Sequence, residues 1–245
     1  MLLHAIDVAP GRSGHAEKSA LLLHGMMGSA ESWHRVIPLL ADRGYRVLSL
    51  DLPGHGLSPR DPEITVDTAA ASVIETVDAA GLPHPVHAIG HSLGATVLAA
   101  SAPILAPEVT VYVDSPLRFT GHGDRNELVA RYQTDRATRT DAERLHALRP
   151  YYSAQDIAVE ARAAERFDPS TAASVSSGED VAISPRSGDV LIHADPSRWV
   201  TDADIDRFTR SGVSVRSVSG AEHTIWYSHL DAFTASLPEM FEPTP

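Results

Sequence analysis

The alternation of short apolar runs with stretches of helical spacing limits the possible folds of this chain more than any other feature. Apolar runs that predict strands occupy residues 20–23, 46–50, 86–89, 109–113, 189–192 and 213–218. Stretches of helical spacing separate or follow them at residues 32–43, 66–80, 92–105, 204–210 and 225–237. Strands that alternate with helices form parallel sheets covered on both faces, and such strands are continuously apolar. The sequence therefore predicts an α/β protein with a mostly parallel central sheet and helices on both faces.

One long segment breaks this alternation. Residues 117–180 contain no apolar run that predicts a strand, whereas residues 125–148 and 153–167 have helical spacing. Residues 170–188 are rich in Ser and Gly and predict a loop. Because α/β proteins bind ligands at one edge of the sheet, we expect this insertion to form a helical cap over that edge. The predicted division is a core of residues 1–116 and 181–245 and a cap of residues 117–180.

The composition excludes several classes of function. The 245 residues carry a formal net charge of -12, which argues against nucleic acid and anionic membranes as partners, because phosphate-binding surfaces need clustered cations. The absence of cysteine excludes thiolate chemistry and cysteine-ligated metals. The chain has no spacing typical of metal ligands or of a dinucleotide fingerprint, so we expect neither a metal nor a cofactor.

The sequence also argues against membrane insertion. Residues 1–10 lack the basic segment and the apolar run of a signal peptide. The most apolar later stretch, residues 86–106, is broken by His87, Gly90, His91 and Ser92 and is too polar for a transmembrane helix. We therefore expect a cytoplasmic protein, and its oligomeric state stays open.

A G-x-S-x-G motif at residues 90–94 identifies a candidate nucleophile. The residues Gly90-His91-Ser92-Leu93-Gly94 come directly after a predicted strand and directly before an alanine-rich helix. A sharp turn between strand and helix holds the serine in a strained, exposed conformation, and the glycines remove side chains that would clash. The alternative is a serine that only caps the helix. The strand before the motif and the helix after it favour Ser92 as a nucleophile.

Three further motifs accompany this turn: HGMMGS at residues 24–29, DLPGHGLS at residues 51–58 and GAEH at residues 220–223. In this order, from residue 21 to residue 233, the motifs resemble those of the α/β-hydrolase superfamily. The resemblance implies the α/β-hydrolase fold, with a helical cap after the strand that the family counts as its sixth, here residues 109–113. It also implies that His223 is the catalytic base and that the backbone N–H groups of Met26 and Leu93 form an oxyanion hole. The DLPGHGLS loop, with His55, is expected to shape the site and not to supply a second base.

The acid that orients His223 has two candidates. The position that most of the family uses, after the strand at residues 189–192, holds Ser197 here, and Asp195 lies two residues earlier. A subgroup of small bacterial serine esterases takes its acid from the end of the preceding sheet strand and carries a serine in the later position. Asp114 and Ser197 match that subgroup, so we favour Asp114 over Asp195 and expect Ser197 to be a supporting hydrogen-bond partner of His223. Either carboxylate would fix the tautomer of His223 and stabilise its protonated form.

The resemblance therefore implies a serine hydrolase that acts on a small-molecule carboxylic ester through an acyl-enzyme intermediate, without a cofactor. Two alternatives stay open: a hydrolase or lyase acting on C–C bonds or thioesters on the same fold, and a small-molecule receptor that keeps the triad. The arginines of the predicted cap have two interpretations. They bind an anionic group of the substrate or, as we favour, they lie on a solvated helix face among interleaved acids. These arginines are Arg118, Arg125, Arg131, Arg136, Arg139, Arg144 and Arg149.

Overall fold

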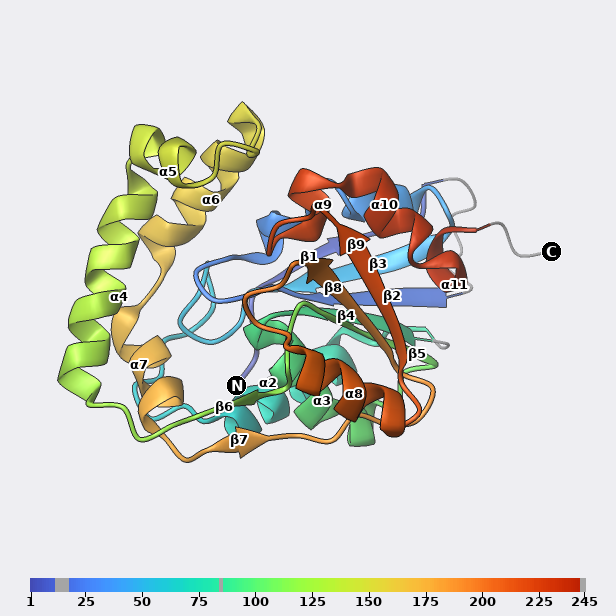
Figure 1. Cartoon of the computed structure of the whole chain (residues 1–245), viewed down its shortest axis with the longest axis horizontal. Coiled ribbons are helices and arrows are strands. Elements are labelled where there is room, and N and C mark those ends of the chain that lie inside the picture. Colours follow the sequence, from blue (N-terminus) through green and yellow to red (C-terminus); the bar gives the residue numbers. More distant parts are fainter. Residues whose placement is uncertain (12–17, 84–85, 243–245) are drawn as a thin grey trace.

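A central sheet of seven strands organises the protein, as a computed structural model that describes residues 1–11, 18–83 and 86–242 shows (Figure 1). Its strands run in the spatial order β1 (Ala5–Val8), β3 (Tyr45–Leu50), β2 (Lys18–Leu23), β4 (Val86–His91), β5 (Val109–Val113), β8 (Val190–Asp195) and β9 (Ser214–Ser219). The edge strand β1 is antiparallel to β3, and all other neighbouring strands are parallel. The prediction of a mostly parallel sheet is confirmed.

Helices cover both faces of the sheet because successive side chains of each strand point to opposite faces. In β2, Leu21 and Leu23 pack with α2 (Val66–Ala80), α3 (Leu93–Leu105) and α8 (Asp202–Arg210). Leu22 points to the opposite face. It packs with residues from four short helices: α1 (Ile37–Ala41), α9 (Ile225–Ser228), α10 (Leu230–Ala235) and α11 (Pro238–Phe241). The core therefore has two apolar layers, one on each side of the sheet.

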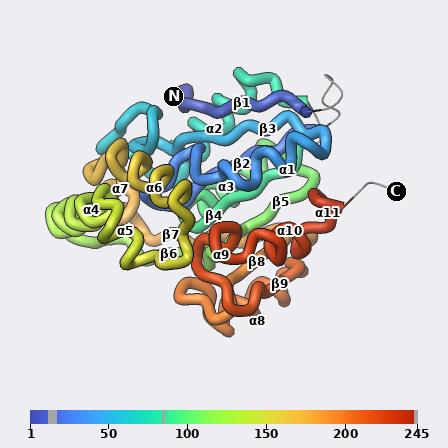
Figure 2. The backbone as a smooth tube through the Cα atoms, turned by 90° about the horizontal axis from the view of Figure 1, so that it is seen from above, coloured from blue at the N-terminus to red at the C-terminus, as the bar shows by residue number. Residues whose placement is uncertain are grey.

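Four helices lie between β5 and β8 in the sequence, and they form the segment 125–177. They are α4 (Arg125–Thr140), α5 (Ala142–Leu148), α6 (Ala154–Arg166) and α7 (Pro169–Ser177). Figures 1 and 2 show them together at one side of the sheet. This insertion confirms the predicted fold class with its helical cap. The exact division between core and cap stays a prediction.

The predicted loop at residues 170–188 is wrong in its first half, where α7 forms. Ser and Thr favour helices only weakly, so the composition there predicts no helix. The structure supplies what the composition lacks: the Asp168 carboxylate accepts the Thr171 N–H at 3.0 Å and caps the helix, and Pro169 begins it. Ala172 and Ala173 are buried in a cluster with α4 residues. Tertiary packing therefore makes this helix.

Short elements also differ from the predictions. The predicted helix at residues 32–43 is a 3-10 turn, η1 (Ala30–Trp33), followed by α1. Two strands of two residues each, β6 (Arg118–Phe119) and β7 (Val181–Ala182), pair antiparallel at the base of the segment 125–177. A two-residue strand is too short to produce a periodic pattern in the sequence.

Among the described residues, no helix combines the length and the apolarity that crossing a membrane requires.

Candidate active site

Ser92 occupies the turn between β4 and α3, in a backbone conformation that is rare for any residue other than glycine. Its φ is 51° and its ψ is -116°. Strain of this kind is retained where the surrounding structure enforces it, and it is common at active sites. The neighbouring glycines permit the turn. A Cβ atom on Gly90 would lie 2.6 Å from the Cα atom of Ala95, and one on Gly94 would lie 2.4 Å from the carbonyl oxygen of His24.

The loop after β2 brings further backbone groups beside Ser92. The N–H groups of Met26 and Leu93 have no hydrogen-bond acceptor among the described residues. Leu93 is the first residue of α3, where a free N–H group and the positive end of the helix dipole both favour negative charge. Two free donors beside a serine are what an oxyanion hole requires.

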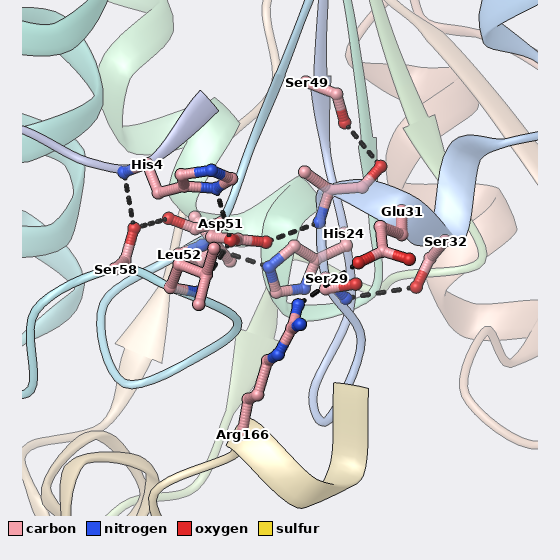
Figure 3. Close-up of polar contacts among 12 residues, drawn as sticks. His4, His24, Ser29, Glu31, Ser32, Ser49, Asp51, Leu52, Ser58 and Arg166 are labelled. Carbon is pink, nitrogen blue, oxygen red and sulfur yellow. Dashed lines mark hydrogen bonds and ion pairs between the residues drawn. The ribbon is translucent and has the colours of Figure 1, made fainter. Parts of the chain in front are cut away.

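Residues of the DLPGHGLS loop bond the loop after β2 from its side (Figure 3). The N–H group of Leu52 donates to Nε2 of His24 at 3.0 Å, so Nδ1 of His24 carries the hydrogen that bonds the Gly25 carbonyl at 2.7 Å. Burial lowers the pKa of His24, which keeps the ring neutral in this role. The Asp51 carboxylate accepts the N–H groups of Ala30 and Leu57 at 2.7 Å and 2.8 Å. These residues hold the two loops together.

His55 lies in the same loop and is buried, with 2% of its surface exposed. Its ring is 5.0 Å from that of Phe167 and bonds the Pro53 carbonyl through Nδ1 at 2.9 Å. Burial lowers the pKa of His55 to about 3, and the ring is therefore neutral near pH 7. The contacts of His55 are those of a packing residue.

The loop after β2 is also held from the side of the helical segment. Met27 adopts a φ of 63° and is buried, with 2% exposed. It packs in a cluster, here called the Met27 cluster, with residues from α4, α7 and the end of α6: Leu128, Tyr132, Phe167, Ala172 and Ala173. Met26 packs against the edge of this cluster. The conformation of the loop after β2 therefore depends on helices far away in the sequence.

Asp114 and His223 meet directly. The Nδ1 atom of His223 lies 2.6 Å from Oδ2 of Asp114, which is 1% exposed. Because the carboxylate accepts, Nδ1 carries the hydrogen and Nε2 keeps its lone pair. Asp114 follows β5 directly, and its N–H group donates to the carbonyl of Ile192 in the neighbouring strand β8 at 2.8 Å. Asp195, the other candidate acid, is the exposed last residue of β8, and its side chain bonds none of the described residues.

Ser197 contacts Asp114 and not the imidazole. Its hydroxyl donates to Oδ1 of Asp114 at 2.8 Å, and the N–H group of Ala194 donates to the same oxygen at 3.1 Å. The N–H groups of Trp199 and Val200 both donate to the Ser197 oxygen, which leaves its hydrogen for the carboxylate. The prediction that Ser197 is a hydrogen-bond partner of His223 is therefore wrong, because its hydroxyl bonds the carboxylate of Asp114 instead.

His91 holds the loop that carries His223, a role that its sequence position alone did not reveal. Its Nε2 atom lies 3.0 Å from the carbonyl oxygen of His223 and donates to it, and the two rings are 4.5 Å apart. Burial is the main cause that lowers the pKa of His91 well below its ordinary value, so the ring stays neutral. The only signal for this role in the sequence is that His91 lies inside the nucleophile motif.

The candidate catalytic residues face one cavity of about 1090 Å³. Ser92, His223, Met26 and Leu93 line it, and helices α4 and α6 with the loop after α5 form its outer wall. The Ser92 hydroxyl has no hydrogen bond with the described residues, His223 included. Catalytic hydrogen bonds are often long without a substrate and shorten when one binds. The volume suits a small organic molecule.

The predicted arginines divide into two groups. Three bond elsewhere on the surface and do not line the cavity, namely Arg125, Arg136 and Arg144. Four line it, namely Arg118, Arg131, Arg139 and Arg149.

Comparisons with known proteins fit this geometry. The model of a family described as the alpha/beta hydrolase family matches residues 20–236. The chain is similar to the pimeloyl-acyl-carrier-protein methyl ester esterase of Methylococcus capsulatus, with 41% identity over 87 residues, or 36% of this chain and 32% of the relative. It is also similar to the dihydrolipoyllysine-residue acetyltransferase component of the acetoin cleaving system of Cupriavidus necator, with 37% identity over 117 residues, or 46% of this chain and 30% of the relative. The matches thus span about a third of the length of these curated relatives.

Solved structures resemble the chain over almost its whole length. An esterase from Exiguobacterium antarcticum has a TM-score of 0.75 at 14% identity and covers 98% of this chain and 96% of its own. The N-formylmaleamic acid deformylase of Pseudomonas putida S16 has a TM-score of 0.74 at 18% identity, covering 96% of this chain and 94% of its own. At these identities the likeness shows the fold.

Proposed function

The chain belongs to the alpha/beta hydrolase family, and from this premise we propose that it is a serine hydrolase that cleaves carboxylic esters through an acyl-enzyme intermediate. One observation carries the proposal: Ser92, in its strained turn, shares a cavity with His223, whose Nδ1 lies 2.6 Å from the carboxylate of Asp114. A serine, a base and an acid that orients the base are the groups that acyl transfer to serine needs.

In the first half of the reaction, Oγ of Ser92 attacks the carbonyl carbon of the ester. Its proton passes to Nε2 of His223, which has a free lone pair because Nδ1 carries the hydrogen bonded to Asp114. The carboxylate of Asp114 then stabilises the imidazolium that forms. We assign the acid to Asp114 and not to Asp195, because Asp114 is buried and in contact with the ring, whereas the Asp195 side chain is exposed.

Negative charge develops on the carbonyl oxygen during the attack, and the N–H groups of Met26 and Leu93 stabilise it. Each preorganised donor is worth about 3–4 kcal/mol in the transition state. The intermediate collapses when His223 gives its proton to the leaving alcohol, and the acyl group stays on Ser92. Water then attacks the acyl-enzyme with His223 as the base, the acid leaves, and the serine regains its proton.

Esters are the proposed substrates because two similar proteins are named esterases. One resembles part of the chain in sequence, and the other resembles it in fold. We also propose that the chain functions as a core of residues 1–116 and 181–245 with a cap of residues 117–180. The cap helices form the outer wall of the cavity, so they are placed to select the acyl group or the alcohol.

The test is covalent labelling of the nucleophile. A fluorophosphonate probe should label the wild type at Ser92, and a panel of p-nitrophenyl esters of different chain lengths should be hydrolysed. Ser92→Ala should abolish labelling and lower kcat by about 10⁴-fold or more. The control is Ser176→Ala, because Ser176 lines the same cavity but bonds Tyr132 at 2.6 Å. Labelling that persists in Ser92→Ala would refute the assignment.

A further inference from the structure

Arg139 is a cation without a partner at the wall of the catalytic cavity. It lies in the last turn of α4, is half-buried and lines the cavity with Ser92 and His223. Its guanidinium forms no hydrogen bond and no ion pair with the described residues. A buried or half-buried charge is costly unless something compensates it, so an unpaired guanidinium at this place calls for an explanation.

The other half-buried arginines that the structure describes all have partners. Arg136, on the same helix, and Arg149 donate to backbone carbonyl groups. The rest pair with carboxylates, namely Arg35, Arg46, Arg125, Arg166, Arg207 and Arg216. Arg139 is therefore an exception among the half-buried arginines that the structure describes. Its place near the C-terminus of α4 gives a small favourable dipole interaction, which a side chain directed to solvent would provide equally well.

The charge of Arg139 reaches residues around the nucleophile. It adds to burial in lowering the pKa of His91, the residue that precedes Ser92. Burial raises the pKa of Glu160 and raises that of Tyr151 to about 12, and the charge of Arg139 opposes both shifts. Arg139 lines the same cavity as these three residues, so its guanidinium lies within electrostatic reach of the catalytic centre.

The acids of the cavity leave this charge uncompensated. Asp114 bonds His223, and Glu160 accepts the hydroxyl of Tyr227 at 2.8 Å. Asp135, one helical turn before Arg139, and Glu222 also line the cavity, but neither forms an ion pair with Arg139. A substrate with a negative group would thus find a free guanidinium in a partly desolvated pocket, where charge-assisted hydrogen bonds are strong.

We propose that Arg139 binds an anionic group of the substrate, and that the esters which this site cleaves best carry a free carboxylate. The planar guanidinium matches a carboxylate with two parallel hydrogen bonds, and one arginine balances one such charge. This inference rests on the proposed function, because it names the substrate class of the same site. Half-esters of dicarboxylic acids are the simplest molecules of this class.

The kinetic test compares mono-p-nitrophenyl glutarate with p-nitrophenyl valerate, which has the same acyl length but no charge. The wild type should prefer the glutarate ester in kcat/KM. Arg139→Met should reduce this preference by about 10-fold to 100-fold, mainly through KM, since the charged contact is made in ground and transition states alike. Hydrolysis of the valerate ester should fall far less than that of the glutarate ester, because binding energy at a remote group is lost only for the substrate that carries it. Arg139→Lys should retain part of the preference because it keeps the charge and loses the fork.

The matched control is Arg136→Met, which removes a cation from the same helix but not from the cavity. It should leave the preference unchanged. An equal loss in Arg136→Met and Arg139→Met would overturn the proposal, since the effect would then come from the general charge of α4. So would equal kcat/KM for the two esters in the wild type.

Binding to an inactive protein tests the inference without chemistry. In the Ser92→Ala background, calorimetry should show that the glutarate ester binds about 10-fold or more weakly once Arg139→Met is added. Inorganic phosphate is the second probe. If phosphate binding depends on Arg139 and glutarate ester binding does not, the carboxylate assignment is overturned.

The two proposals fail in different ways. Ser92-dependent hydrolysis of the valerate ester without a preference for glutarate would reject the carboxylate site and leave the serine hydrolase in place. Absence of any Ser92-dependent turnover would reject the proposed function, and the binding measurement would then decide the role of Arg139 by itself.

Discussion

Replacing Asp114 by asparagine should invert the polarity of the contact with His223 while preserving the shape of the site. The Oδ1 atom of Asp114 accepts hydrogen bonds from the N–H group of Ala194 and the hydroxyl of Ser197. That hydroxyl has no freedom to turn round, because the Ser197 oxygen already accepts two backbone N–H groups. The carbonyl oxygen of the new asparagine is therefore held at the Oδ1 position, and its NH₂ group must face His223.

The cost of this inversion follows from the 2.6 Å contact between Oδ2 and Nδ1 of His223. An NH₂ group at this position donates to Nδ1, so the ring must carry its hydrogen on Nε2. The lone pair that should accept the proton of Ser92 is then lost. We expect kcat of Asp114→Asn to fall by about 10⁴-fold, because the wrong tautomer must be corrected in every turnover. Hydrolysis of a p-nitrophenyl ester measures this loss.

Two comparisons make the result decisive. Asp195→Asn should stay within a few-fold of the wild type, since the Asp195 side chain bonds none of the described residues. The unfolding midpoint of Asp114→Asn should change little, because the asparagine keeps the bonds to Ala194 and Ser197. Retention of more than about a tenth of wild-type kcat by Asp114→Asn would refute the reasoning, and a loss in Asp195→Asn instead would move the acid to β8.

Three further predictions follow from the site. The double variant of Ser92→Ala and His223→Ala should be scarcely slower than either single variant in ester hydrolysis, because members of one catalytic unit are not additive, and additive losses would contradict their joint action. Ser197→Ala should reduce kcat less than Asp114→Asn, by about 10-fold, because it removes one of the bonds that hold the carboxylate; a loss as large as that of Asp114→Asn would give the serine a direct role. Burial lowers the pKa of His55 from 6.5 to about 3, so protonation favours the unfolded chain, and stability should fall as pH drops from 6.5 towards 3. Urea unfolding should show a decline of up to about 1.4 kcal/mol per pH unit from this residue, which His55→Gln should remove.

Local features of the site were predictable because a short motif specifies them. Ser92 lies where the G-x-S-x-G motif places it, since Gly90 and Gly94 allow a turn that any side chain at those positions would block.

The helix at residues 66–80 was predicted to the residue. Its capping residue, Thr65, and the glycine that ends it, Gly81 with a φ of 59°, are both visible in the sequence.

Features that depend on tertiary contacts were not predictable. The edge strand β1 has no continuous apolar run because one face of an antiparallel edge strand meets solvent. The spacing of Asp135 and Arg139 predicts an ion pair on α4. The two residues do not pair, and both line the cavity, which the sequence does not show. The contact of His91 with the His223 carbonyl joins residues 132 positions apart, which no pattern in a single sequence encodes.

The Met27 cluster joins the helical segment to the loop after β2, in addition to the part that this segment takes in the wall of the cavity. Met27 is anchored among Leu128, Tyr132 and Phe167, and the N–H group of its neighbour Met26 is one of the two donors that we propose for the oxyanion. Grafting α4 to α7 from a relative to change the substrate range would remove that anchor and let the loop relax. We therefore expect such chimeras to lose turnover together with selectivity, unless Met27 is replaced jointly with its partners. In this chain, a change of specificity through the helical segment is therefore expected to need a matching change at Met27.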